Sequence, residues 1–269
     1  MTTERLDTLA TIIDTTLQYS SNESIKRLER LLSDDDDPAT ALLCAASLTV
    51  FKANLTTFTD EEQRALNNFI NLGESRAETI PKEATADALF VRGMTRLLRV
   101  VNDQANDRAS DLNDFTTQGE VSKSMIQQAL LIEPSNEVYQ LIHAASLRFF
   151  PTSLKDPRKQ EGVTRLETLS RANGIVAVAA KLMLADHAVR RGAWDSLLEI
   201  TQDLKKVYPR ASCMHTLGGV ALRRLRQPAA AEKEFKAALR MNRRDTLAKL
   251  ELDNLMELGE SQRSRSESK

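Results

Sequence analysis

Apolar residues recur every three or four positions along most of this chain, which is the spacing of one face of an α-helix. The first such stripe lies within residues 3–19 and consists of Leu6, Leu9, Ile12, Ile13 and Leu17. The same pattern is found in residues 22–32, 39–55, 60–72, 83–101, 136–149, 158–171 and 245–258. Long alternations of Val, Ile or Thr with polar residues, which are typical of strands, are missing. The pattern therefore predicts an all-α fold.

Residues 175–244 contain two helix pairs with similar successions of large and small apolar residues. The first copy consists of Leu184, Ala185 and Ala188, followed by Gly192, Leu197, Leu204 and Pro209. The second consists of Leu217, Gly218 and Ala221, followed by Ala231, Phe235, Ala238 and Arg243. Gly192 suits the left-handed residue that ends a helix. The spacing from Pro209 to Arg243 is about 34 residues, and the spacing from Leu184 to Leu217 is one residue shorter.

This period, with small residues in the first helix and a stop after the second, resembles the tetratricopeptide repeat (TPR), whose period is about 34 residues. The resemblance is clearest over residues 175–244 and weaker over 38–171. Arg243 departs from the family's closing Pro, and the turn around Gln227 and Pro228 is one residue longer than the family pattern. An ordinary pair of helical hairpins is the alternative. The resemblance implies an all-α, right-handed solenoid of antiparallel helix pairs, a TPR-like superhelix.

The pattern predicts four regions along the chain. They are acidic helix pairs in residues 1–80, TPR-like pairs in 81–174, two repeats with a capping helix in 175–258, and a disordered polar tail in 259–269. In the second region, Gly93 and Ala129 are about 36 residues apart, whereas the corresponding positions of the family are about 19 apart. The excess matches the polar residues 102–118, which we expect to form a mobile insertion rather than an ordered contact element.

Charge is distributed unevenly along the chain, although the formal net charge is only −1. Residues 1–80 carry 7 basic and 14 acidic side chains, whereas residues 181–244 carry 14 basic and 6 acidic side chains. Such an asymmetry steers charged partners, although solvated helix faces also produce it. The basic region is therefore a candidate binding surface.

Three features indicate where the protein is found. The N-terminus carries Glu4 and Asp7 and lacks the basic start and apolar core of a signal peptide. The longest apolar stretch, residues 41–51, is too short to span a bilayer. The cysteines Cys44 and Cys213 lie far apart on apolar helical segments, as buried free thiols of a reducing compartment do. We therefore expect a cytoplasmic protein without a membrane span, and a nuclear location stays open.

No combination of residues predicts an enzyme. The three histidines, His143, His187 and His215, lie in different helices, and Cys213 points to a different helix face from His215. The acidic run 34–37 has no spaced ligand pattern after it and is best explained as an exposed turn that precedes a helix. The sequence therefore predicts no catalytic residue, no metal site and no cofactor.

The resemblance implies a peptide-binding groove lined by the first helix of each pair. The positions that match it are Leu182, Asp186, Val189, Arg190, His215, Gly219, Leu222 and Arg223. The Lys and Asn with which some family members clamp a C-terminal carboxylate are absent from these positions. In this interpretation Arg190 and Arg223 are equivalent, and the partner is a protein segment with acidic and aliphatic residues.

The leading hypothesis is thus a non-enzymatic scaffold or adaptor that binds protein segments within a multi-subunit assembly. The alternative is a nucleic-acid-associated protein that uses the basic C-terminal half to contact phosphates. Its contacts would be Arg190, Arg191, Arg223, Arg224 and Arg226. Only 4% of the residues are aromatic, so few side chains are available to stack on bases.

Overall fold

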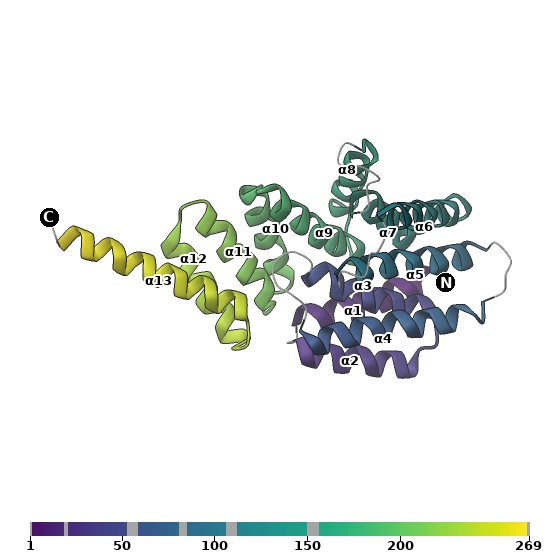
Figure 1. The fold of residues 1–269 in the computed structure, drawn as a ribbon, viewed down its shortest axis with the longest axis horizontal. Helices are drawn as coiled ribbons and strands as arrows, with labels where there is room; N and C mark the ends of the chain where they lie inside the picture. The colour runs from purple at the N-terminus through teal and green to yellow at the C-terminus, as the bar shows by residue number, and fades with distance from the viewer. Residues whose placement is uncertain are drawn as a thin grey trace. The chain divides into compact units, whose positions relative to one another are not determined.

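The computed structural model describes residues 2–18, 21–52, 59–80, 85–105, 112–149 and 156–267, and these residues form thirteen helices (Figure 1). The helices are α1 (Thr2–Gln18), α2 (Ser21–Asp34), α3 (Pro38–Lys52), α4 (Asp60–Ala77), α5 (Ala86–Ala105), α6 (Leu112–Ile132), α7 (Glu137–Phe149), α8 (Arg158–Ser170), α9 (Ile175–Arg191), α10 (Trp194–Val207), α11 (Ser212–Arg224), α12 (Pro228–Met241) and α13 (Thr246–Glu267). The described residues contain no strand, which confirms the all-α prediction. None of their helices is both long and apolar enough to cross a bilayer.

The chain divides into two compact units. The N-terminal unit contains Met1–Thr16, Ser21–Lys52 and Phe58–Met183. The C-terminal unit consists mainly of Leu184–Lys269. The division falls inside α9, nine residues after the predicted boundary at residue 175. Within each unit, helices that follow one another in the sequence pack against one another.

The N-terminal unit is built from the helical hairpins α3–α4, α5–α6 and α7–α8. Leu42, Leu66 and Phe90 are completely buried in it. The Phe90 ring stacks on the Tyr139 ring with centroids 4.5 Å apart, an arrangement that stabilises more than apolar burial alone. The core of this unit therefore draws on helices from well-separated parts of the sequence.

The predicted insertion at residues 102–118 is largely helical in the structure. α5 continues to Ala105 and α6 begins at Leu112, while residues 106–111 lie outside the described residues. Asn102 is buried, accepts a hydrogen bond from Gln63 Nε2 at 2.7 Å and donates one to Asn67 Oδ1 at 2.9 Å. The expectation of a loop was wrong for these helical parts. Asn102 is polar in the sequence, but in the fold it is buried on α5 and hydrogen-bonded to side chains of α4.

The C-terminal unit repeats its helix boundaries at a constant interval. α10 and α12 begin at Trp194 and Pro228 and end at Val207 and Met241, a spacing of about 34 residues at both ends. α11 and α13 begin at the same interval from one another. α13 extends to Glu267, so most of the segment expected to be a disordered tail is helical, and residues 268–269 lie outside the described residues.

The turns inside the two helix pairs have the same backbone geometry. Gly192 and Arg226, one repeat apart, have φ angles of 67° and 60°. In the first turn, Ala193 N donates to Ala188 O at 2.9 Å. In the second, Gln227 N donates to Leu222 O at 2.9 Å. This pairing is the left-handed helix C-terminus that favours glycine, and the second copy carries an arginine there.

The structure corrects the register of the second helix pair by one residue. A Cβ on Gly219 would lie 2.5 Å from Cε1 of Phe235, so the backbone of α11 approaches the ring of α12 here. A Cβ on Gly218 would lie 3.4 Å from Thr201 Oγ1, an ordinary contact. Gly219, and not Gly218, is therefore the small residue at the α11–α12 contact. With this register the turn around Pro228 is no longer than the one in the first copy.

Candidate functional site

The predicted groove residues lie on α9 and α11, and the corrected register changes which of them are equivalent. The repeat observed in the helix boundaries pairs Arg190 with Arg224 and Val189 with Arg223. The sequence analysis treated Arg190 and Arg223 as equivalent, but their separation is one residue short of a full repeat. The helix boundaries therefore do not support that equivalence. One added residue rotates a helical position by about 100°, so the two arginines project differently.

On α9 the predicted residues are mostly buried or engaged with one another. Leu182 is buried within the N-terminal unit. In the C-terminal unit, Arg190 Nε donates to the buried Asp186 Oδ2 at 3.0 Å, one helical turn away. Val189 is half-buried. The carboxylate of Asp186 thus binds an arginine of its own helix.

On α11, His215 is part of a polar contact among three helices. Its Nδ1 lies 2.7 Å from Glu234 Oε2 of α12, and its Nε2 lies 3.3 Å from Pro209 O. Lys205 Nζ of α10 donates to Glu234 Oε1 at 2.7 Å. Burial would raise the pKa of Glu234, but hydrogen bonds from His215 and Lys205 outweigh it and hold the pKa below its usual value. His215 therefore joins helices of the fold.

The other residues predicted on α11 are also used within the unit. Gly219 faces Phe235, and Leu222 is buried in the same apolar cluster. Arg223 pairs with Glu251 of α13: its Nη2 donates a hydrogen bond to Oε1 at 3.1 Å, and its Nε lies 2.7 Å from Oε2 as an ion pair. This pair joins α11 to α13. Several residues predicted for the groove thus make contacts within the protein: Arg190 pairs within α9, and His215, Gly219, Leu222 and Arg223 contact α12 or α13.

Three of the exposed cations of this unit lie at the turns between paired helices. Arg191, Arg224 and Arg226 are exposed, and we call these three residues the basic edge. The guanidinium carbon of Arg224 lies over the ring of Trp194, 5.5 Å from its centroid, which is a cation–π contact. This contact places the α9–α10 turn beside the α11–α12 turn. The sequence analysis named these arginines but not Trp194. The available signal was that Arg226 lies one repeat after Gly192, at the equivalent position of the next turn.

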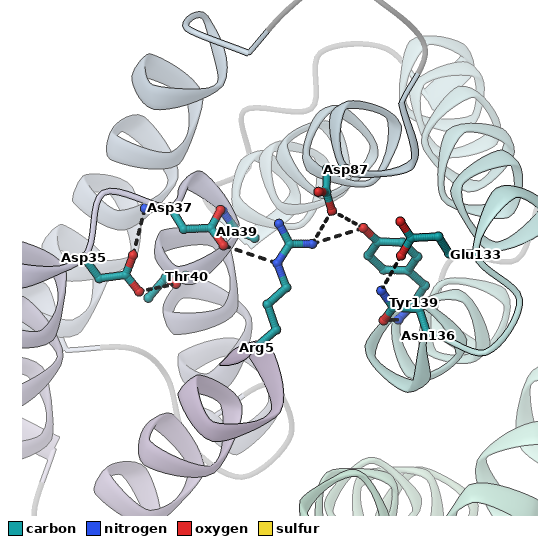
Figure 2. A network of polar contacts seen from close by, with 9 residues as sticks. All are labelled: Arg5, Asp35, Asp37, Ala39, Thr40, Asp87, Glu133, Asn136 and Tyr139. Atoms are coloured by element: carbon teal, nitrogen blue, oxygen red, sulfur yellow. Dashed lines mark hydrogen bonds and ion pairs between the residues drawn. The ribbon is translucent and has the colours of Figure 1, made fainter. Parts of the chain in front are cut away.

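A second polar cluster lies in the N-terminal unit (Figure 2). Arg5 Nε donates to Asp37 Oδ2 at 3.2 Å, and Arg5 Nη1 donates to Asp87 Oδ1 at 2.5 Å and to Tyr139 Oη at 3.0 Å. Tyr139 in turn donates to Asp87. Burial and this hydrogen bond raise the pKa of Tyr139 well above its usual range. Burial lowers the pKa of Arg5, but Asp37 and Asp87 outweigh it and raise the pKa. Arg5 of α1 thus binds side chains at the start of α3, on α5 and on α7.

The acidic run before α3 serves structural contacts. Asp37 Oδ1 accepts from Ala39 N at 3.0 Å, and Asp35 Oδ2 accepts from Thr40 Oγ1 at 2.7 Å, so both carboxylates engage the first turn of α3. Arg76 Nη1 donates to Asp35 O at 2.7 Å. Among the described residues, no group of three or more His, Cys, Asp or Glu side chains is placed to hold a metal ion.

An open depression of about 480 Å³ lies between the end of α4, α5 and α6. It is lined by Glu74, Ala77, Glu78, Ile80, Arg92, Thr95, Arg96 and Met125. Its charged groups include paired ones, since Arg99 binds Glu74 and Arg96 Nη1 donates to Gln118 Oε1 at 2.7 Å. The depression is thus lined by acidic and basic side chains together, and its lining does not favour a ligand of one charge.

Neither cysteine is prepared for nucleophilic chemistry. Burial raises the pKa of the Cys44 thiol far above its usual range. Burial, with Asp245 nearby, raises the pKa of Cys213 to about 12. Because the thiolate is the reactive form, these shifts disfavour thiol chemistry at both positions. Cys44 is also buried, whereas Cys213 is half-buried.

No protein-family model matches the chain, and no curated protein matches it either.

Proposed function

We propose that this protein is a non-enzymatic, TPR-like scaffold or adaptor that binds protein segments within a multi-subunit assembly. The observation that carries the proposal is the constant spacing of about 34 residues between the helices of the C-terminal unit, together with the matching turn geometry of Gly192 and Arg226. In repeat proteins such pairs stack into a superhelix whose surface binds extended partners. In this proposal the pairs form a right-handed solenoid and the protein acts in the cytoplasm.

The proposed partner segment carries aliphatic and acidic residues. The half-buried Val189 of α9 is an apolar contact for it on the first-helix face, and the cations of the C-terminal unit are contacts for carboxylates. The other predicted residues support this binding by fixing the helices. The Arg223–Glu251 pair, for example, holds α11 against α13.

The proposal is tested by capturing partners from the native cell with the full chain, identifying them, and measuring their direct binding with purified components. Nuclease treatment and a salt titration separate protein recognition from phosphate contacts, because binding to nucleic acid weakens steeply with salt. Capture that disappears after nuclease treatment would replace the scaffold with the nucleic-acid alternative.

A matched pair of variants tests whether the first-helix face binds the partner. Val189→Glu places a charge on the first-helix face, whereas Val207→Glu places the same charge at an exposed position at the end of α10. We expect Val189→Glu to reduce partner binding at least about tenfold, the effect of about 1.4 kcal/mol, with an unchanged circular dichroism spectrum. Val207→Glu is expected to bind normally. Equal binding by both folded variants would show that this face does not contact the partner.

A further inference from the structure

The basic edge combines features that the predicted groove does not have. We propose that Arg191, Arg224 and Arg226 bind the carboxylates of an acidic protein segment, at the turns and not on the first-helix face. This inference rests on the protein-binding function proposed above and specifies where the acidic residues of the partner bind. Four observations carry it.

The first observation is proximity. Arg191 is the last residue of α9 and Arg224 is the last residue of α11. Arg224 lies over Trp194, the first residue of α10, so the end of α11 lies beside the turn that follows Arg191. Several guanidinium groups on one edge bind a segment with more than one carboxylate better than a lone cation does.

The second observation is the backbone of Arg226. Its φ angle of 60° lies in the left-handed region, which a glycine adopts at the equivalent position of the preceding turn. Residues that have a Cβ rarely adopt this backbone conformation, and Arg226 is one of them. Backbone strain of this kind occurs preferentially where a side chain has a binding role. Arg226 thus places a guanidinium group on the edge although its backbone conformation is strained.

The third observation is the state of these cations. Arg191 and Arg226 form no ion pair with any residue in the part of the chain that the structure describes. The arginines beside them differ, because Arg190 binds Asp186 and Arg223 binds Glu251. The neighbouring arginines are therefore already neutralised by carboxylates, while the basic edge keeps its charge available to a partner.

The fourth observation favours a protein segment over a polynucleotide. Arg224 covers one face of Trp194, the only tryptophan of the chain, which reduces the area available for stacking a base. The next residue of α10, Asp195, is exposed and carries a negative charge. A polypeptide can space its carboxylates to avoid this charge, whereas a phosphate backbone carries one charge at every nucleotide, so an acidic protein segment fits the edge better.

The single tryptophan reports binding directly, because its ring lies against Arg224 of the basic edge. The full chain is titrated with a short synthetic peptide of alternating Glu and Leu residues, and Trp194 fluorescence is followed. The same titration is made with a Lys–Leu peptide and with an oligouridine. We expect the Glu–Leu peptide to change the emission, the Lys–Leu peptide to have no effect, and the oligouridine to bind more weakly at equal salt.

The deciding variant is R191Q/R226G, which removes two charges and puts glycine where the preceding turn already has one. The matched control R243Q/R244Q removes two exposed arginines from the α12–α13 turn. Two exposed ion pairs together account for roughly a tenfold change in affinity. We expect the dissociation constant for the Glu–Leu peptide to rise by about that factor in R191Q/R226G and to stay unchanged in the control.

Each other outcome overturns the inference. Equal affinities of both variants would place the acidic contacts elsewhere, and the absence of any fluorescence change with the Glu–Leu peptide would do the same. Tighter binding of oligouridine that depends on Arg191 and Arg226 would make the edge a polynucleotide site.

Partner capture separates this inference from the proposed function. If R191Q/R226G captures the same purified partner as the unaltered chain, the scaffold function stands and the edge is not its site. If peptide binding depends on the edge but no protein partner is found, the scaffold function fails and the edge remains a site for acidic peptides.

Discussion

The two units of this chain differ in how far apart in the sequence the partners of their internal polar contacts lie. In the N-terminal unit, Arg5 bonds to residues 32, 82 and 134 positions away in the sequence. In the C-terminal unit, the pairs Lys205–Glu234 and Arg223–Glu251 span 29 and 28 positions, slightly less than one repeat. In the first unit one cation thus joins distant parts of the sequence, whereas these two pairs of the second unit join α10 to α12 and α11 to α13, within one repeat.

This difference predicts different responses to mutation. When each helix pair contacts mainly its neighbours, stability is close to a sum of local terms, and a lost contact has a limited cost. When one buried cation serves three partners, its removal leaves several polar groups unpaired at once. Four predictions test this contrast, beginning with the largest effect.

Arg5→Ala is expected to have the largest effect. It leaves Asp37, Asp87 and Tyr139 without their shared donor, and breaking a buried ion pair from one side costs about 3–5 kcal/mol. Chemical denaturation should show this loss in the free energy of unfolding. The control is Arg27→Ala on α2, which removes an exposed pair with Glu23 that is worth about 0.2–1 kcal/mol. Similar losses in the two variants would contradict the role of the network.

The next effect is expected at the α11–α12 contact. Gly219→Ala places a Cβ 2.5 Å from the Phe235 ring, and such overpacking costs about 1–3 kcal/mol. Gly218→Ala meets only ordinary contacts and gains roughly 0.5–1 kcal/mol from the higher helix propensity of Ala. Denaturation midpoints that move in opposite directions would establish the register. A larger loss in Gly218→Ala would restore the register predicted from the sequence.

A smaller, pH-dependent effect is expected at Glu234. Its pKa is lowered in the fold, so the carboxylate contributes stability above its unfolded pKa and loses it as the pH falls through the folded pKa. Glu234→Gln should therefore be less stable than the unaltered chain at neutral pH. The difference should disappear in acid, below the ordinary range of carboxyl groups. Thermal melting of both proteins as a function of pH measures this, and a difference that stays constant into strong acid would exclude the ion pair as its cause.

The smallest effect is expected at Arg226. Arg226→Gly removes a Cβ from a residue with a φ angle of 60°, which relieves about 1 kcal/mol of backbone strain. The melting temperature should rise slightly. Gly192→Ala is the reverse change at the equivalent position and should lower it. A destabilised Arg226→Gly would mean that the arginine side chain contributes more to the fold than its backbone strain costs.

The sequence alone determined the helical class and the period of the C-terminal unit. A stripe of apolar residues every three or four positions is local information, because a helix must bury one face whatever it packs against. The repeat spacing and the left-handed end at Gly192 could be predicted for the same reason, since glycine and proline act on the backbone within one turn.

Only the tertiary structure decided the register and the state of the polar residues. Gly218 and Gly219 are adjacent and identical, so only the position of the Phe235 ring shows which one is at the helix contact. Asn102 belongs to a polar stretch of the sequence, yet it is buried and hydrogen-bonded to Asn67, 35 positions away. Arg223 and Arg226 look alike in the sequence, but Glu251 neutralises the first and not the second. Packing partners distant in the chain determine burial and pairing, and a local pattern contains no information about them.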